Sequence, residues 1–148
     1  MAFDVTPYLS VPYVPNGRSW EGWDCWGLAV AVFRRELGIE LPAWDTIDST
    51  DLAQAAVTTA TEAASWLEVT IEQARPFDVL LLTDCGRPVH AGVVLCPPQF
   101  LHCARGFGTV VASYVDRRQI WRRRLVGIFR HPALASVDRH GPPQAVSA

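Results

Sequence analysis

The chain has 148 residues, of which 49% are hydrophobic and 19% charged, and its formal net charge at pH 7 is -2. This length allows one sizeable hydrophobic core and is too short for two. The nearly balanced charge argues against bulk nucleic-acid binding. We therefore expect a single globular domain that binds no nucleic acid.

The N-terminal residues have neither the basic stretch nor the apolar stretch of a secretory signal peptide. No apolar run approaches the roughly 20 residues that cross a bilayer. We expect a protein that is made in a cytoplasm, stays soluble and has no membrane span. Its cysteines should then be reduced, and their spacing fits no zinc motif, so we predict no metal and no cofactor. The four cysteines are Cys25, Cys85, Cys96 and Cys103. We interpret the last three as small buried hydrophobic residues.

Two helices are predicted in the first half of the chain. Residues 1–24, rich in Pro, Gly and aromatic side chains, predict an ordered but irregular N-terminal segment. Residues 25–37 are apolar on nearly every face, which is typical of a buried helix, and Gly38 is the expected stop. A second helix is predicted over about 51–66, with one apolar face.

The second half of the chain predicts short strands separated by turn residues. They are Val79–Leu82, Val89–Leu95, Phe100–Cys103, Thr109–Val115 and Leu125–Phe129. The connections are too brief for crossover helices, so neighbouring strands should be antiparallel. Helices followed by antiparallel strands predict an α+β fold in one domain over residues 1–131, with a flexible C-terminal tail over 132–148.

Cys25 is the candidate nucleophile. It lies at the start of the predicted buried helix, in the run Asp24-Cys25-Trp26-Gly27. Backbone N–H groups and the helix dipole at that end favour the reactive thiolate. Asp24 occupies a natural N-cap position, and Gly27 allows another segment or a substrate to approach closely. The alternative is a buried structural cysteine.

A nucleophilic cysteine needs a base and a group that orients the base. His131 and His140 lie at or in the predicted tail, which makes them weak candidates. His90 opens a strand beside small residues, and His102 lies on the next strand. Antiparallel pairing of those strands would bring the two rings together. We predict His90 as the base and His102 as the orienting group, although Asn, Gln or a backbone carbonyl could replace His102. Two ordinary half-buried histidines are the alternative.

Taken together, these residues resemble the NlpC/P60 family of papain-like cysteine peptidases. The segments that carry the resemblance are Pro12-Tyr13, Gly17 to Trp23, Asp24-Cys25-Trp26-Gly27-Leu28, Phe77-Asp78-Val79-Leu80, His90-Ala91-Gly92-Val93-Val94 and Phe100-Leu101-His102. They occur in the family's order and run from about Val11 to Arg130. The resemblance implies a papain-like fold with N-terminal helices packed on a mostly antiparallel sheet of five to six strands.

The resemblance also implies an activity and a substrate site. Similar proteins cut amide bonds in the stem peptides of bacterial peptidoglycan, typically between D-glutamate and diaminopimelate. Tyr13 and Asp24 match family positions near the substrate or the oxyanion, and Trp26 and Gly27 are added to them as binding candidates. The chain departs from the family pattern at Trp26, where Ser is usual, and at Phe77, where Gly is usual.

The Trp variant of the motif looks like the branch encoded in the tail modules of tailed phages, and the run from Trp121 to Arg130 looks like the closing strand of that branch. This implies a peptidase in the virion tail tip or baseplate of a phage or a gene transfer agent, with tail-tip or hub proteins as partners. We expect synthesis in the host cytoplasm and action in the periplasm or cell wall. The absence of a signal peptide agrees with delivery by a particle.

Several alternatives remain open. They are a structural tail-tip or hub component with little or no activity, a peptidoglycan amidase, a thiol acyltransferase and a protease that matures tail proteins. A cluster of arginines predicts either the solvated face of an edge strand or a surface that docks an acidic partner or the anionic wall. It comprises Arg117, Arg118, Arg122, Arg123, Arg124 and Arg130.

Overall fold

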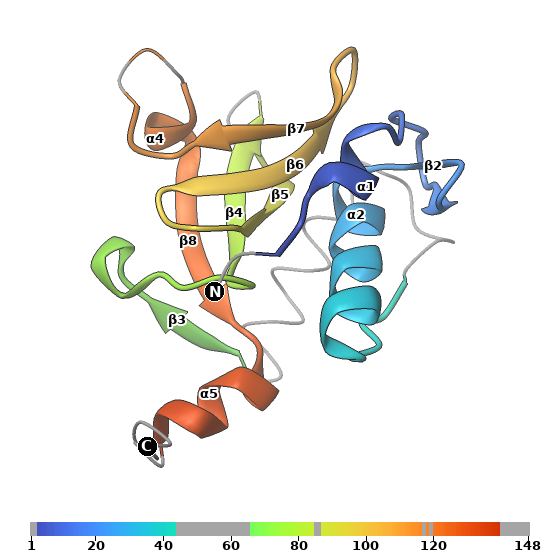
Figure 1. The fold of residues 1–148 in the computed structure, drawn as a ribbon. Coiled ribbons are helices and arrows are strands. Elements are labelled where there is room, and N and C mark those ends of the chain that lie inside the picture. Colours follow the sequence, from blue (N-terminus) through green and yellow to red (C-terminus); the bar gives the residue numbers. More distant parts are fainter. Residues whose placement is uncertain (1–2, 44–65, 85–86, 117, 119, 140–148) are drawn as a thin grey trace.

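The computed structural model describes residues 3–43, 66–84, 87–116, 118 and 120–139. Within these residues, N-terminal helices pack beside a six-stranded antiparallel sheet (Figure 1). The α+β class and the mostly antiparallel sheet that the sequence predicts are confirmed. The helix predicted over 51–66 lies almost wholly outside the described residues.

The N-terminal segment is more regular than its composition predicts. It forms a short helix, α1 (Thr6–Leu9), and a hairpin of β1 (Arg18–Ser19) and β2 (Gly22–Trp23). Trp23 is fully buried, and its indole N–H donates to the Thr109 hydroxyl at 2.9 Å. That bond fixes the hairpin against a distant strand of the main sheet.

Helix α2 (Cys25–Val32) confirms the buried helix predicted to start at Cys25. All its residues after Cys25 are buried, as expected of a helix that is apolar on every face. A π-helical turn, η1 (Phe33–Leu37), extends it. The helix ends at Gly38, whose φ of 66° lies in the left-handed region that glycine tolerates best.

The main sheet has the order β3-β8-β4-β5-β6-β7, and neighbouring strands are antiparallel. Its strands are β3 (Leu67–Val69), β4 (Val79–Asp84), β5 (Arg87–Val94), β6 (Gln99–Ala104), β7 (Gly108–Ser113) and β8 (Leu125–Arg130). All five predicted strands are present, with ends that differ by one or two residues. The three-residue strand β3 was not predicted, because it is too short to show an alternating pattern.

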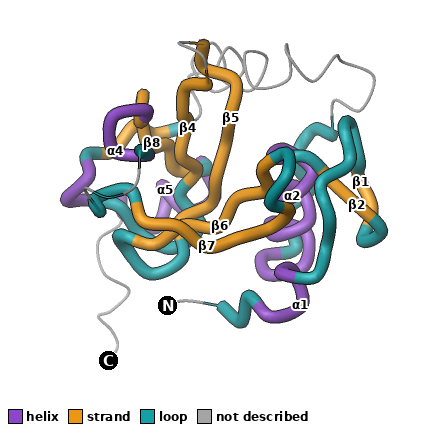
Figure 2. The backbone as a smooth tube through the Cα atoms, turned by 90° about the horizontal axis from the view of Figure 1, so that it is seen from above, coloured by secondary structure: helices purple, strands orange, loops and turns teal. Residues whose placement is uncertain are grey.

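Each face of the sheet carries its own hydrophobic cluster, because successive side chains in a strand point to opposite faces. Val93 and Leu101 pack with the helices in one cluster, whereas Val94 and Phe100 belong to the other. Figure 2 shows α2 to one side of the sheet, with β1 and β2 beyond it. Helix α2 is therefore held against strands β5 and β6.

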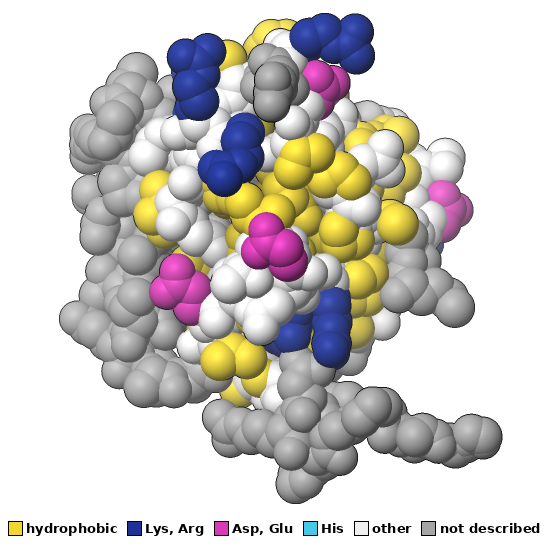
Figure 3. All heavy atoms as spheres, turned by 90° about the vertical axis from the view of Figure 1, so that its left-hand side faces the viewer, with side chains coloured by type: hydrophobic (Ala, Val, Ile, Leu, Met, Phe, Trp, Pro, Cys, Tyr) yellow, Lys and Arg dark blue, Asp and Glu magenta, His cyan; other side chains and the backbone are white. Residues whose placement is uncertain are grey.

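The arginine-rich segment differs from the sequence interpretation. The run from Trp121 to Arg130 begins with helix α4 (Trp121–Arg124). The predicted closing strand therefore starts only at Leu125. The edge-strand interpretation is wrong, because β8 lies between β3 and β4. Arg118, Arg122 and Arg123 are exposed, whereas Arg130 is buried. Figure 3 shows the side of the molecule that carries this segment, where dark blue arginines flank a central patch of hydrophobic side chains.

Residues 132–139 form a helix, α5 (Pro132–Arg139), where the composition predicted a flexible tail. The rest of the predicted tail, 140–148, lies outside the described residues. In the part of the chain that the structure describes, no helix is both long enough and apolar enough to cross a membrane.

A buried ion pair ties the end of β8 to the start of β4. The Arg130 guanidinium donates to both carboxylate oxygens of Asp78, from Nε at 2.8 Å and from Nη2 at 2.9 Å. Nη2 also donates to the Gln73 carbonyl at 2.8 Å. Asp78 is 0% exposed, so neither charge can exchange its partner for bulk water.

We expect Asp78→Ala to lower the free energy of unfolding by about 3–5 kcal/mol, because it leaves the Arg130 charge buried without its carboxylate. Urea denaturation followed by circular dichroism measures the change. The control is Arg34→Ala, which breaks an exposed pair with Glu40 and should cost less than about 1 kcal/mol. A loss for Asp78→Ala no larger than that of the control contradicts the prediction.

Candidate active site

The Cys25 side chain lies between helix α2 and strand β5. Cys25 is the first residue of α2 and is half-buried. The backbone N–H of Ala91 hydrogen-bonds to its sulfur. Ala91 directly follows His90, the predicted base, in strand β5.

Asp24 holds the first turn of α2 in place. Its Oδ1 accepts from the Gly27 N–H at 2.9 Å and from Arg18 Nη1 at 2.7 Å. Its Oδ2 accepts from the Asn16 N–H at 3.1 Å, and the residue is only 2% exposed. The predicted N-cap is confirmed. Both carboxylate oxygens are engaged within the chain, and direct contact of Asp24 with the substrate stays a prediction.

Trp26 and Gly27 serve the packing of the site in this structure. Trp26 is 3% exposed, and its indole N–H donates to the Pro42 carbonyl at 2.7 Å. A Cβ at Gly27 would collide with the Gly17 carbonyl oxygen and with Trp23. The close approach that Gly27 permits is therefore made by the chain's own backbone. Substrate binding by Trp26 and Gly27 stays a prediction.

The environment of Cys25 opposes the thiolate that the helix end was expected to favour. Burial of the sulfur raises the pKa of Cys25 to about 12, and the Asp24 charge pushes the pKa in the same direction. The Ala91 N–H and the Arg18 guanidinium lower it, but less than burial raises it. The resting form is therefore the thiol, which needs a base to remove its proton.

The two predicted histidines meet, as the antiparallel pairing of β5 and β6 indicated. His90 Nε2 and His102 Nδ1 are 2.8 Å apart, a hydrogen-bond distance, and the rings are nearly perpendicular at 83°. The strands are registered at Val93 with Leu101 and at Val94 with Phe100. This places the two histidines diagonally across the ladder.

His102 is the neutral partner of this pair. It is 2% exposed, and burial, followed by the charge of His90, lowers its pKa to about 3. A neutral His102 that presents Nδ1 as an acceptor receives the N–H of His90 Nε2. Nδ1 is then the ring nitrogen of His90 that takes no part in this hydrogen bond.

Trp121 covers the histidine pair and was missed in the sequence analysis. Its ring stacks on His90, with centroids 5.6 Å apart, and meets His102 edge-on at 4.6 Å. Phe100 stacks on His102 from β6 at 4.9 Å. Gly92 makes room for Phe100, since a Cβ there would lie 2.6 Å from the Phe100 ring. Aromatic side chains therefore fix both imidazoles and keep water from His102.

Tyr13 lies near the nucleophile on the N-terminal segment. Its backbone bridges to Trp23, two residues before Cys25. Burial raises the pKa of the Tyr13 hydroxyl, Arg105 opposes the rise, and the charges of Asp24 and Cys25 add to it. These electrostatic interactions place Tyr13 in the neighbourhood of the thiol, and its role at the substrate or the oxyanion stays a prediction.

The other histidines and cysteines lie elsewhere or outside the description. His131 packs on Phe33 and Trp66. Cys103 is buried, as predicted, but Cys96 is exposed, which corrects its interpretation as a core residue. Cys96 follows β5 in a turn, where nothing covers it in the described structure. His140 and Cys85 are outside the described residues. Among the residues that are described, no cluster of His, Cys, Asp or Glu could hold a metal ion.

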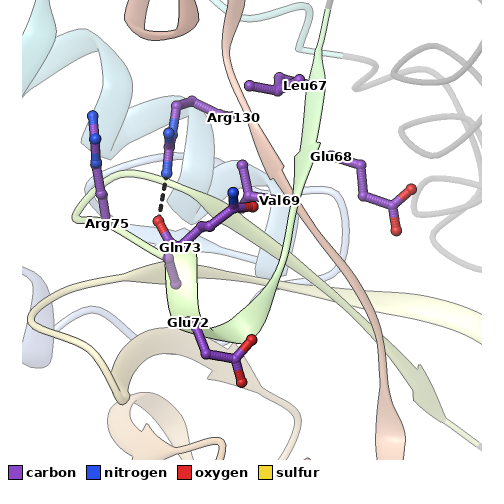
Figure 4. Close-up of a pocket in the computed structure, with 8 residues that line it drawn as sticks. Leu67, Glu68, Val69, Glu72, Gln73, Arg75 and Arg130 are labelled. Carbon is purple, nitrogen blue, oxygen red and sulfur yellow. Dashed lines mark hydrogen bonds between the residues drawn. The ribbon is translucent and has the colours of Figure 1, made fainter. Parts of the chain in front are cut away.

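A separate cavity of about 490 Å³ lies between β3, the 3-10 helix η2 (Ile71–Gln73) and the end of β8. Figure 4 shows Arg130 reaching Gln73 in its wall, with Arg75 alongside. His90 pairs with Leu82 at one end of β4, whereas the cavity lies near the other end, beside Asp78. The cavity is therefore distinct from the cysteine–histidine site.

Comparison with known proteins bears on the family and the fold of this chain. A model described as the NlpC/P60 family matches residues 10–130. The NlpC/p60 domain of the peptidoglycan hydrolase SagA has a TM-score of 0.58 at 22% identity, covering 84% of this chain and 90% of that one. An NlpC/P60 family protein from Bacillus cereus has a TM-score of 0.61 at 18% identity, covering 84% and 36% respectively.

The peptidoglycan hydrolase RipB from Mycobacterium tuberculosis has a TM-score of 0.57 at 17% identity, covering 86% of this chain and 60% of that one. The chain thus spans most of the SagA domain but less than two thirds of the B. cereus and M. tuberculosis proteins. No curated protein sequence matches it. The structural likenesses show the fold, and the family model covers most of the sequence. This chain belongs to the NlpC/P60 family.

Proposed function

We propose that this protein is a cysteine peptidase that hydrolyses stem-peptide amide bonds of bacterial peptidoglycan. Cys25 is the nucleophile, His90 the base and His102 the group that orients the base. The observation that carries the proposal is the 2.8 Å contact between His90 Nε2 and His102 Nδ1, together with a cysteine at a helix start. Packing alone requires no such set of residues.

The reaction begins with proton transfer from the Cys25 thiol to His90 Nδ1. The sulfur attacks the peptide carbonyl carbon, and the carbonyl oxygen takes the negative charge. Backbone N–H groups at the start of α2 are suited to stabilise that oxygen. The C–N bond then breaks, and His90 returns the proton to the leaving amine. Water, deprotonated by His90, attacks the thioester and releases the acid and the thiol.

His102 directs the proton through His90. When His90 carries two protons, its Nε2–H donates to the neutral His102. The positive charge therefore stays on His90, the proposed base. This role corresponds to that of the orienting residue in a catalytic triad, which fixes tautomer and ring orientation.

We place the scissile bond between D-glutamate and diaminopimelate. Support comes from membership in a family of cell-wall peptidases and from the likeness to SagA and RipB, both named peptidoglycan hydrolases. A peptidoglycan amidase, a thiol acyltransferase and a maturation protease use the same chemistry on other bonds. Mass spectrometry of the released fragments distinguishes the four.

We also place the peptidase at the tail tip of a phage or phage-like particle, from which it reaches the cell wall. Support comes from the motif Asp24-Cys25-Trp26-Gly27, which resembles the tail-module branch. The alternative is a structural hub component with little or no activity. Both assignments are open to direct tests.

We expect Cys25→Ala to reduce the release of new amines from purified peptidoglycan by at least about 10³-fold, because the nucleophile is lost. His102→Ala should cost about 10²-fold or more, through the base that it orients. The control is Cys96→Ala, which removes an exposed cysteine outside the site and should leave the rate unchanged. Equal rates for folded wild type and Cys25→Ala would exclude the enzyme and favour the structural alternative.

Trp121→Ala should lower kcat by about tenfold or more, because water gains access to the histidine pair. Loss of burial should also raise the pKa of His102 from about 3 toward its ordinary value. Imidazole NMR checks the second effect: His102 should not titrate between pH 5 and 8 in the wild type but should titrate there in the variant.

The control for that experiment is Trp20→Ala, at an exposed tryptophan on the N-terminal hairpin. Trp121→Phe should restore part of the activity, since it keeps an aromatic face over His90. If the His102 imidazole titrates between pH 5 and 8 in neither protein while Trp121→Ala lowers kcat, Trp121 acts otherwise than by shielding the His102 ring from water.

Particles that carry Cys25→Ala should assemble with the chain present in the tail, detected by mass spectrometry, but should penetrate the wall poorly. Penetration is measured as infection or gene transfer per adsorbed particle. Absence of the chain from wild-type particles contradicts the tail-tip assignment. An unprocessed tail protein in the mutant particles would instead identify a maturation protease.

A further inference from the structure

The turn between β6 and β7 lies against the N-terminal segment that leads to the nucleophile. Arg105 is exposed in this turn. At its end, Gly108 has a φ of 72°, and a Cβ there would lie 3.6 Å from the Val11 carbonyl oxygen and 3.9 Å from Pro12. Backbone of the turn and backbone of the segment are therefore nearly in contact.

Buried hydrogen bonds on both sides of the turn hold it there. After the turn, the Thr109 hydroxyl donates to the Val11 carbonyl and accepts from the Trp23 indole, each at 2.9 Å. Before the turn, the Cys103 thiol donates to the Trp23 carbonyl at 3.3 Å. The turn that carries Arg105 is thus fixed against the N-terminal segment.

Arg105 rests on Tyr13. Its guanidinium carbon lies 5.3 Å from the centre of the Tyr13 ring, and the guanidinium hydrogen-bonds to the Tyr13 hydroxyl. Such stacking holds the cation without neutralising its charge. Tyr13 in turn interacts electrostatically with Cys25. The guanidinium is therefore held at the rim of the site.

The charge of Arg105 has no acidic partner among the described residues. Arg18, the other arginine close to the nucleophile, is neutralised by Asp24 at 2.7 Å. Asp24 is also fully engaged by Asn16 and Gly27, so it does not serve Arg105 as well. Within the described part of the chain, the Arg105 guanidinium beside Tyr13 thus keeps a positive charge that no carboxylate neutralises.

We propose that Arg105, supported by Tyr13, binds a carboxylate of the substrate beside the scissile bond. The inference rests on the proposed function. A γ-linked D-glutamate keeps its α-carboxylate free, and diaminopimelate keeps a carboxylate at the end of its side chain. The guanidinium fork matches either group through two parallel N–H···O bonds. The subsite makes the enzyme select acidic stem peptides over neutralised ones.

Three synthetic stem peptides distinguish the two sources of the carboxylate. The parent contains D-glutamate and diaminopimelate; one analogue carries D-isoglutamine, and the other carries L-lysine in place of diaminopimelate. Wild type should cleave one analogue about tenfold less efficiently, in kcat/KM, than the parent. Arg105→Ala should lose about tenfold on the parent and become indifferent to that same analogue.

Arg105→Lys should keep part of the preference, because it keeps the charge but not the fork. Arg118→Ala, at an exposed arginine on the segment before α4, should behave like the wild type. If Arg105→Ala cleaves the parent normally, or still discriminates against both analogues, the carboxylate subsite is overturned.

Binding to Cys25→Ala, measured by calorimetry, separates this inference from the proposed function. If wild type cleaves no peptide but Cys25→Ala binds the parent more tightly than an analogue, and adding Arg105→Ala removes the difference, the subsite stands and the hydrolase assignment falls. If Arg105→Ala leaves the affinity for the parent peptide unchanged, or if no peptide binds at all, the subsite is overturned.

Discussion

The buried carboxylate of Asp24 is the contact on which the site depends. It joins the backbone at Asn16, the Arg18 side chain and the first turn of α2 through Gly27. Asn16 and Arg18 belong to the N-terminal segment, whereas Gly27 belongs to α2, so Asp24 ties the segment to the helix. Because its oxygens satisfy backbone N–H groups at the helix start, Asp24 fixes where the helix begins and hence where Cys25 lies. The same negative charge also raises the pKa of the thiol that it positions.

The base is positioned by a different part of the fold. His90 and His102 belong to the sheet, and their contact is set by strand register and by the aromatic rings around them. Helix α2, which begins at Cys25, packs on β5 and β6 through the helix-side core. The dry surroundings of His102 come from the opposite cluster, which contains Phe100 and borders Trp121. Both faces of one sheet thus contribute to a single site.

Much of this arrangement could be predicted from local pattern. The apolar helix from Cys25, its stop at Gly38 and the meeting of His90 with His102 follow from periodicity and strand pairing. The role of Trp121 could not be predicted, because its contacts join α4 to β5 and β6 across sequence separations that no local pattern records. The burial of Arg130 could not be predicted either, because its partner Asp78 lies 52 residues away in the sequence.

Phe77, which departs from the family pattern, lies at a turn with an unusual backbone conformation. Phe77 stands where glycine is usual, and its φ of 75° lies in the left-handed region that glycine adopts most readily. Its ring stacks on Phe3 with centroids 5.1 Å apart. The unusual side chain thus adds a contact with the N-terminal segment at a turn where the backbone conformation favours glycine.

The charges around Cys25 decide which group activates it. A helix N-terminus stabilises a negative charge by about 0.3–1 kcal/mol, which corresponds to less than about one pKa unit. Burial and Asp24 raise the thiol pKa from its ordinary value of 9.0 to about 12, a larger effect in the opposite direction. The helix end alone does not offset burial, so in the proposed function His90 takes the thiol proton before the sulfur attacks. In the same proposed function, the N–H groups of the first turn act on the oxyanion, which forms only as the reaction proceeds.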